Sequence, residues 1–223
     1  MMNGIVKRFI AIVRCWRMLP QLDGVTDVDR LVEFAFSHTI TPSQIRSELI
    51  ELAKVIAEAE PVRALEIGTC GGGTLFLLCR LAAPVATVVS VDLPRGPYGA
   101  GYSALRIPLY KRFAGPRQSL HLVRADSHHG DTVDRVNKAF CGKPLDFVFI
   151  DGDHSYKGVK RDFEIYSPLV KKGGIVGFHD IAPHPAGWSG DVPRFWDEIK
   201  GRYSWREIVA VPNGGYGIGI LFT

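Results

Sequence analysis

Two short polar clusters contain side chains that could move a proton. The first is residues 151–154, Asp-Gly-Asp-His, and the second is the pair His179-Asp180. A neutral imidazole accepts a proton near pH 7, so His154 or His179 could act as a general base, and the carboxylate of Asp151 could do the same. The chemistry that these residues suggest is removal of a proton from a hydroxyl group. Each histidine could instead be a hydrogen-bonded structural residue.

A glycine-rich turn joins an apolar strand to an apolar helix in residues 62–74, Val-Arg-Ala-Leu-Glu-Ile-Gly-Thr-Cys-Gly-Gly-Gly-Thr. Glycines let the backbone approach a ligand closely, and the N-terminus of the helix offers free N–H groups. The carboxylate of Glu66, next to the turn, would repel the pyrophosphate of a dinucleotide and attract a cation or hydroxyl groups. The turn therefore favours a ligand other than a dinucleotide. A plain strand-to-helix connection is the alternative.

A second candidate binding residue closes the next apolar run. Residues 86–91 read as a strand and Asp92 follows it, roughly 20 residues beyond the glycine turn, where a carboxylate can accept hydrogen bonds from two ribose hydroxyls. A carboxylate in a simple turn is the alternative interpretation of Asp92.

Apolar strands alternate with helices along the chain. Residues 120–124, 145–150 and 175–178 read as further strands, and residues 205–211 and 218–222 read as two strands joined by a glycine turn. Alternation predicts a parallel sheet whose carboxyl ends share one edge, and the polar clusters fall at those ends. We expect an α/β fold with a Rossmann-like, seven-stranded, mostly parallel sheet, a C-terminal antiparallel hairpin and helices on both faces.

The segment from Glu66 to Gly73 resembles the E-x-G-x-x-x-G loop of class I S-adenosylmethionine-dependent methyltransferases. The resemblance covers about residues 41–223, which leaves residues 1–40 as an N-terminal helical extension. It implies S-adenosyl-L-methionine as the cofactor. The residues that it places at the cofactor are Glu66, Gly68, Thr69, Gly72, Asp92, Asp126, Ser127 and Asp151, with Asp126 and Ser127 at the adenine.

Residues 151–162 and 177–180 resemble a bacterial subfamily of small-molecule and sugar O-methyltransferases, often grouped with cephalosporin hydroxylases and macrolide-sugar methyltransferases. This resemblance implies O-methylation of a small polar or sugar-like hydroxyl acceptor. N-methylation and a non-catalytic partner domain that binds the cofactor are the alternatives. A hydroxylase would need an iron site of two histidines and a carboxylate, which His154, His179 and Asp151 could formally supply.

Some similar enzymes, including catechol-type O-methyltransferases, bind Mg²⁺ through carboxylates that follow the fourth and fifth strands. The matching residues here are Asp151 and Asp180, so the resemblance implies a possible Mg²⁺ site. The chain departs from the catechol pattern at Ile181, where those enzymes carry an amide. Without a metal ion, a histidine would serve as the base.

Composition narrows the range of partners. The chain has 223 residues, of which 46% are hydrophobic, and a net charge of +4 from 27 basic and 23 acidic residues. The basic residues are scattered, so we expect no nucleic-acid binding. Four cysteines without C-x-x-C spacing predict reduced thiols and a cytoplasmic location. We expect a small-molecule acceptor as the main partner.

Residues 4–19 predict a basic amphipathic helix that is too interrupted by charge to be an integral membrane segment. It could pack on its own domain or form a homodimer contact. Contact with a membrane surface is the other alternative. Residues 41–44, Thr-Pro-Ser-Gln, predict the start of another helix through a capping box. Long connections at residues 94–112 and 181–192 contain tyrosines, His184 and Trp188, and we expect them to form a lid and to set acceptor specificity.

Overall fold

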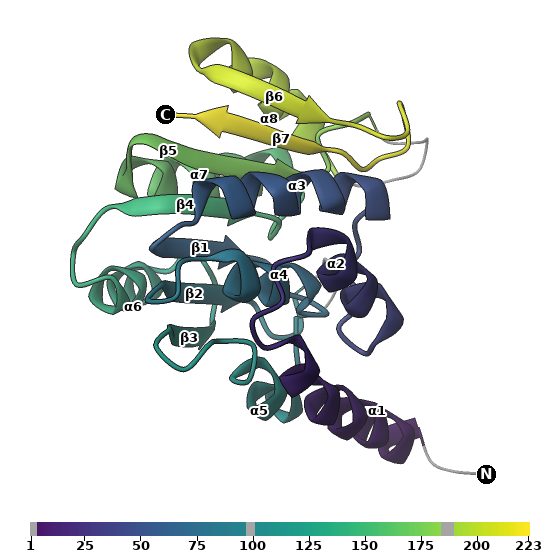
Figure 1. Ribbon diagram of the computed structural model, residues 1–223. Helices are drawn as coiled ribbons and strands as arrows, with labels where there is room; N and C mark the ends of the chain where they lie inside the picture. Colours follow the sequence, from purple (N-terminus) through teal and green to yellow (C-terminus); the bar gives the residue numbers. More distant parts are fainter. Residues whose placement is uncertain (1–3, 97–100, 184–189) are drawn as a thin grey trace.

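The computed structural model describes residues 4–96, 101–183 and 190–223, and within them a seven-stranded sheet forms the centre of the molecule (Figure 1). The strand order is β3-β2-β1-β4-β5-β7-β6. The strands are β1 (Arg63–Ile67), β2 (Thr87–Asp92), β3 (Ser119–Arg124), β4 (Leu145–Ile150), β5 (Val170–His179), β6 (Ser204–Ile208) and β7 (Ile218–Phe222). Strands β1 to β5 pair in parallel, and β7 pairs antiparallel with β5 and β6. The predicted fold is confirmed.

Successive strand residues face opposite sides of the sheet, and each side has its own hydrophobic core. In β1 and β4, Ala64 and Phe147 join one core, whereas their neighbours Leu65 and Val148 join the other. Because both faces are covered by helices, the central strands β1, β2 and β4 are almost fully buried, whereas the edge strand β3 is only partly buried.

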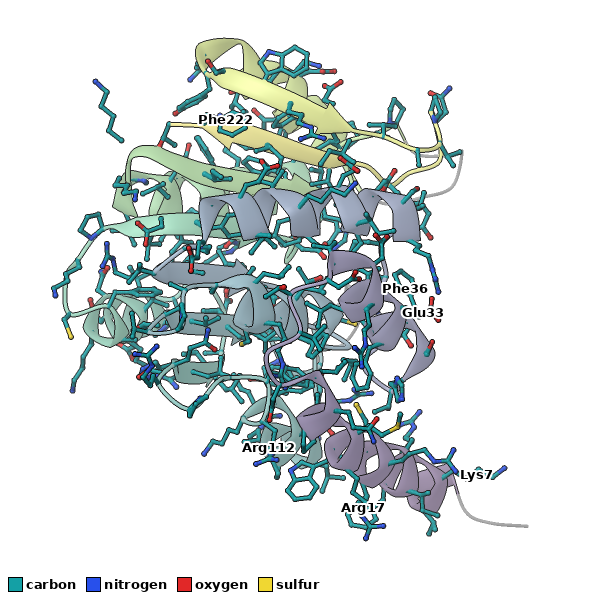
Figure 2. The ribbon with its side chains drawn as sticks, viewed as in Figure 1. Lys7, Arg17, Glu33, Phe36, Arg112 and Phe222 are labelled. Atoms are coloured by element: carbon teal, nitrogen blue, oxygen red, sulfur yellow. The ribbon has the colours of Figure 1, made fainter. Side chains whose placement is uncertain are left out.

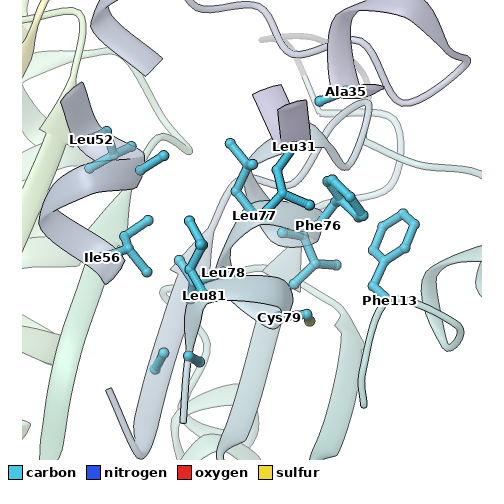
Figure 3. Packing of buried hydrophobic residues seen from close by; sticks show 14 of the residues in the cluster. Leu31, Ala35, Leu52, Ile56, Phe76, Leu77, Leu78, Cys79, Leu81 and Phe113 are labelled. Carbon is cyan, nitrogen blue, oxygen red and sulfur yellow. The ribbon is translucent and has the colours of Figure 1, made fainter. Parts of the chain in front are cut away.

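Helices from the first half of the chain cover one face. They are α2 (Val28–Ser37), α3 (Arg46–Ala59), α4 (Gly73–Leu81) and α5 (Ile107–Tyr110). Figure 3 shows Leu31 of α2, Ile56 of α3 and Phe76 of α4 in this core, with Phe113 beside Phe76. Helix α2 therefore shares a core with the sheet-covering helices, although the expected division places it in an N-terminal extension. The boundary at residue 40 stays a prediction.

Helices from the second half cover the other face: α6 (Gly130–Ala139), α7 (Tyr156–Tyr166) and α8 (Val192–Ile199). Trp196 of α8 packs on Phe178 of β5, with ring centroids 5.8 Å apart, and its indole N–H donates to Glu207 of β6 over 2.6 Å. Helix α8 thus holds the hairpin beside β5. The short 3₁₀ segments are η1 (Leu19–Leu22), η2 (Ala104–Arg106), η3 (Ser167–Leu169) and η4 (Lys200–Arg202).

Helix α1 (Gly4–Met18) lies at the edge of the molecule beside α5, as predicted for residues 4–19 (Figure 1). It is attached through buried Cys15 and through η1, whose Leu19 is also buried. Among the described residues, no helix is long and apolar enough to cross a membrane.

The capping-box prediction for residues 41–44 is wrong. Helix α3 begins at Arg46 with Ile45 as its N-cap and no side-chain cap, and the Thr41 hydroxyl donates to the carbonyl of His38 over 2.7 Å. The segment instead packs against the glycine turn: a Cβ on Gly71 would lie 2.4 Å from the carbonyl oxygen of Thr41. This tertiary contact outweighs the local capping pattern, and it sends Gln44 toward the sheet edge.

Candidate functional site

The carboxyl ends of β1 to β5 bring nearly all candidate residues to one edge of the sheet. Gly68 follows β1, Asp92 ends β2, Asp126 follows β3, Asp151 follows β4 and His179 ends β5. This edge is where open parallel sheets bind ligands, because the strand-to-helix loops leave a crevice there.

Glycine is required at two positions of the turn. Gly68 has φ +87°, and a Cβ on it would lie 1.8 Å from the carbonyl oxygen of Asp151, so only glycine lets the turn pass beside the end of β4. Gly72 has φ +91° and serves as the N-cap of α4, where a Cβ would meet the ring of Tyr110 at 2.6 Å. The Tyr110 hydroxyl donates to the Cys70 carbonyl over 3.0 Å. Tyr110 therefore holds the turn through its ring, beside Gly72, and through its hydroxyl, bonded to Cys70.

Glu66 and Thr69 lie under the turn instead of in the open crevice. Glu66 is fully buried and accepts a hydrogen bond from the Thr69 hydroxyl over 2.7 Å; that hydroxyl also lies 2.5 Å from the hydroxyl of Ser90. Burial raises the pKa of Glu66 well above its usual value, and the Thr69 hydrogen bond only partly opposes this. One carboxylate oxygen, Oε1, has no protein partner. Both residues act as supports of the turn.

Asp92 lines the crevice and also holds the turn. Its Oδ2 accepts hydrogen bonds from the backbone N–H groups of Thr69 (2.8 Å) and Cys70 (2.6 Å). Burial raises the pKa of Asp92, while these two donors oppose the shift by favouring the carboxylate. The residue predicted to bind ribose is thus placed at the crevice, with its carboxylate already accepting hydrogen bonds from the backbone of Thr69, Cys70 and Tyr102.

The crevice itself is acidic. Its walls include the carboxylates of Asp92, Asp126, Asp151 and Asp153, together with the backbone of Gly68. Four carboxylates disfavour a pyrophosphate and favour a ligand that carries positive charge and hydroxyl groups. Of the eight residues predicted at the cofactor, the crevice is lined by Gly68, Asp92, Asp126, Ser127 and Asp151, but not by Glu66, Thr69 or Gly72.

At the β3 end of the crevice, Asp126 and Ser127 are held by a turn and by a tyrosine. The Asp126 carboxylate accepts from the backbone N–H of His128 over 2.9 Å, and the Ser127 carbonyl accepts from the Tyr166 hydroxyl over 2.7 Å. The His128 imidazole lies 3.2 Å from the fully buried carboxylate of Asp162, which raises the pKa of His128. Sequence reasoning missed His128, because nothing local marks it as part of a crevice.

At the β4 and β5 ends, two histidines and two aspartates form one cluster. His154 Nδ1 lies 2.5 Å from Asp180 Oδ2, and His179 Nδ1 lies 3.0 Å from both Asp151 Oδ1 and Asp180 Oδ1. The structure thus brings together all three residues predicted to be catalytic. Asp180 has φ +62°, an unusual conformation for a residue other than glycine, and functional sites often carry such strain.

The two histidines differ in access and in charge. The His154 side chain is 23% exposed, whereas that of His179 is 3% exposed. Burial lowers the pKa of each, but the neighbouring carboxylates outweigh it, so the pKa of His154 is raised and that of His179 is raised to about 9. His179 is therefore enclosed beside two carboxylates, and His154 is the more exposed of the two histidines.

Gln44 is a further member of the cluster that sequence reasoning assigned to a helix cap. Its side-chain amide donates to Asp151 Oδ2 over 2.7 Å, and Gln44 is almost fully buried. Asp151 therefore has one oxygen facing Gln44 and the other facing His179, which fixes the carboxylate at the mouth of the crevice.

The predicted Mg²⁺ ligands, Asp151 and Asp180, already face nitrogen donors. All four of their carboxylate oxygens lie within 3.0 Å of a nitrogen of Gln44, His154 or His179. The described residues contain no group of three or more His, Cys, Asp or Glu side chains arranged to hold a metal ion. Three of these oxygens are hydrogen-bonded, whereas Asp180 Oδ1 is buried without a hydrogen-bond partner among the residues that the structure describes, so the arrangement places the His179 imidazole between two carboxylates.

The connections predicted to form lids are partly packed. Tyr102 and Tyr110 are buried, with ring centroids 5.0 Å apart, which matches the alternative interpretation of loop packing for these two residues. His184 and Trp188 lie outside the described residues. Near the end of the second connection, the backbone N–H of Asp191 donates to the His154 carbonyl over 2.8 Å, so this loop helps to position His154.

Residues 65–181, just over half of the chain, match a protein family described as a methyltransferase domain. An uncharacterized protein of Acanthamoeba polyphaga mimivirus is 44% identical over 147 residues, which are 60% of this chain and 58% of that protein. An uncharacterized protein of Sinorhizobium fredii is 29% identical over 165 residues, which are 73% of this chain but 17% of the relative. The chain thus spans only part of both curated relatives.

Solved structures share the fold. The O-methyltransferase from Bacillus cereus, determined in complex with SAH, superposes with a TM-score of 0.58 at 18% identity, covering 95% of this chain and 100% of that one. Identity at this level shows a shared fold and does not identify a substrate.

Proposed function

The chain belongs to this methyltransferase-domain family, and we propose that it transfers a methyl group from S-adenosylmethionine to a hydroxyl oxygen of a small polar, sugar-like acceptor. The observation that carries the choice of oxygen is the pair of His154 and Asp180, whose side chains meet at 2.5 Å beside the acidic crevice. A hydroxyl acceptor must lose a proton, and a histidine held by a carboxylate is suited to take it.

The acidic lining of the crevice supports S-adenosylmethionine as the cofactor. When bound, it supplies an electrophilic methyl group on a positively charged sulfonium. We propose that Asp92 accepts hydrogen bonds from the ribose, that Asp126 and Ser127 contact the adenine, and that Gly68 lets the cofactor approach the backbone of the turn. The carboxylate of Asp151 adds negative charge to the same wall, which favours a cation there.

We propose His154 as the general base. In this assignment its Nδ1–H donates to Asp180, and Nε2, which lies 3.7 Å from Asp151 Oδ1, accepts the proton from the acceptor hydroxyl. His179 is too buried for direct contact, and we assign it the role of a cation that holds Asp151 and Asp180 in place. Asp151 then acts as a positioning residue.

We further propose that Asp151 and Asp180 serve these two histidines and that transfer does not depend on Mg²⁺. Hydrogen bonds between nitrogen atoms and three of the four carboxylate oxygens support this proposal. The magnesium prediction is tested directly by adding EDTA to the assay described next.

The test is the release of SAH by the full chain, incubated with S-adenosylmethionine and a panel of sugars, phenols and primary amines. The proposal expects turnover with a hydroxyl acceptor, at the same rate in EDTA and in Mg²⁺. Turnover confined to amines would favour the N-methylation alternative, and rates abolished by EDTA would restore the metal site. Cofactor binding with no turnover across the panel would favour a non-catalytic partner domain.

We also propose a cytoplasmic location. All four cysteines are free in the described structure, and two of them, Cys15 and Cys79, are buried, which suits a reducing compartment. A homodimer stays a prediction, and sedimentation velocity tests it.

A further inference from the structure

Helix α1 leaves several large apolar side chains exposed to solvent. Val6, Phe9, Ile10 and Trp16 are 43%, 58%, 44% and 41% exposed. Phe9 and Ile10 follow Val6 by three and four residues, and Trp16 follows Phe9 by seven, so the four lie along one broad stripe of the helix. The opposite stripe carries Cys15, which is buried against the core. Helix α1 therefore has two apolar sides. One packs against the protein through Cys15, and the other is exposed to solvent.

Helix α1 is also basic. Helix α1 contains Lys7, Arg8, Arg14 and Arg17 and no acidic residue. The whole chain has 27 basic and 23 acidic residues, so removing these four leaves 23 of each sign. The entire excess positive charge of the protein thus resides in one helix.

A fifth cation, Arg112, comes from the segment after α5. Its guanidinium lies over the ring of Trp16, 5.0 Å from the centroid. Figure 2 shows Lys7 and Arg17 at the outer side of α1, with Arg112 beside the same helix. In the described part of the chain, none of these three cations forms an ion pair with a carboxylate. Their charge is therefore available to an external partner.

We propose that α1 docks on an anionic lipid bilayer, lying in the plane of the interface with Phe9 and Trp16 inserted among the headgroups. Exposed aromatic and aliphatic side chains flanked by arginine and lysine are the features that bind a helix to such a surface. A second copy of this chain is a poorer occupant, because a two-fold contact of α1 with itself would bring eight basic residues together with no acid to pair them.

Docking through α1 would place the bilayer near the cofactor crevice. A cavity lies between α1 and the segment around η2, with Arg8, Phe9 and Leu105 among its walls. Cys70 and Gly101 line both this cavity and the crevice. The helix that contacts lipid therefore borders the space next to the glycine turn.

The experiment is co-sedimentation of the full chain with vesicles, comparing pure phosphatidylcholine with an equal mixture of phosphatidylcholine and phosphatidylglycerol. Two double variants remove the two halves of the surface: Phe9→Ser with Trp16→Ser, and Arg14→Gln with Arg17→Gln. Val85→Ser with Val211→Ser is the matched apolar control, since both valines are at least as exposed as Trp16. Lys138→Gln with Lys143→Gln is the matched charge control. Unchanged unfolding temperatures show that the variants fold.

The proposal expects binding to the anionic vesicles only, and weaker binding at high salt because the attraction is screened. The arginine variant should bind roughly thirtyfold more weakly, at about fivefold per charge, and the aromatic variant should bind at least tenfold more weakly, while both controls bind like the wild type. Equal binding of all variants, or no binding to anionic vesicles, would overturn the proposal. A dimer in sedimentation velocity that the aromatic variant dissociates, without vesicle binding, would assign the surface to a second copy.

Discussion

Nδ1 of His154 lies 2.5 Å from Oδ2 of Asp180, across the carboxyl ends of β4 and β5. Because Asp180 is buried and His154 is partly exposed, the pair presents one reachable imidazole with its far side fixed. The same carboxylate reaches His179 through its other oxygen at 3.0 Å. This relationship distinguishes two histidines that look equivalent in the sequence.

Replacing His154 with alanine should lower the turnover number by about 10² to 10⁴ while leaving the affinity for SAH unchanged, since the proposed base lies beside the crevice and is not among its lining residues. Steady-state rates and SAH titration measure the two effects separately. His129→Ala is the matched control, because His129 is an exposed histidine at the start of α6. Equal rates for both variants would remove His154 from the mechanism.

The turnover rate should rise with pH through a single ionisation. A general base works in its neutral form, and the pKa of His154 is raised above its usual 6.5 mainly by the hydrogen bond with Asp180, against the effect of burial. In Asp180→Asn the midpoint of the pH profile should move to lower pH, and the plateau should also fall because the imidazole is less well oriented. A midpoint that does not move would contradict the pairing.

The stability of the protein should decrease as the pH rises from about 6.5 to about 9. The folded protein holds the proton of His179 up to a pKa of about 9, above the usual value of 6.5, so this stabilisation is complete below pH 6.5 and is lost as pH passes through 9. The loss is up to about 3 kcal/mol of the free energy of unfolding. Urea denaturation at several pH values measures it, and His179→Gln should flatten the decrease. An equal decrease in both proteins would contradict the assignment.

Replacing Gln44 with leucine should weaken SAH binding, because Asp151 loses the donor that fixes Oδ2 at the crevice wall. The loss of one hydrogen bond to a carboxylate corresponds to roughly tenfold in affinity. Gln21→Leu serves as control, since Gln21 is an exposed glutamine in η1. If Gln44→Leu bound SAH like the wild type while unfolding at the same temperature, Gln44 would have no positioning role.

Much of the architecture could be predicted because each step depends on local pattern. Apolar strands alternating with helices fix a parallel sheet, and the glycine turn after β1 marks its ligand edge. Residues such as Asp92 and Asp151 follow strands directly, so their common edge follows from the topology. Predictions that rest only on strand order were therefore confirmed.

The features that the sequence does not reveal depend on contacts between distant segments. Gln44 and Asp151 are 107 positions apart, and nothing near Gln44 distinguishes this contact from a helix cap. The rank of His154 over His179 likewise depends on burial by β7 and its preceding loop, where Tyr216 lies near the His179 ring. The sequence identifies Glu66 as the acid next to the turn. Its burial under the turn, where Thr69 donates to it and Ser90 lies next to Thr69, depends on packing between strands.

The central claim is that the acidic crevice binds the adenosyl cofactor, and calorimetric titration of SAH into EDTA-treated protein tests it without an acceptor. The account predicts one micromolar site whose affinity does not change when Mg²⁺ is added. Asp92→Asn should weaken it at least tenfold, because an amide cannot accept the two ribose hydroxyls as a carboxylate does. Absence of SAH binding by the folded wild-type protein would contradict the account.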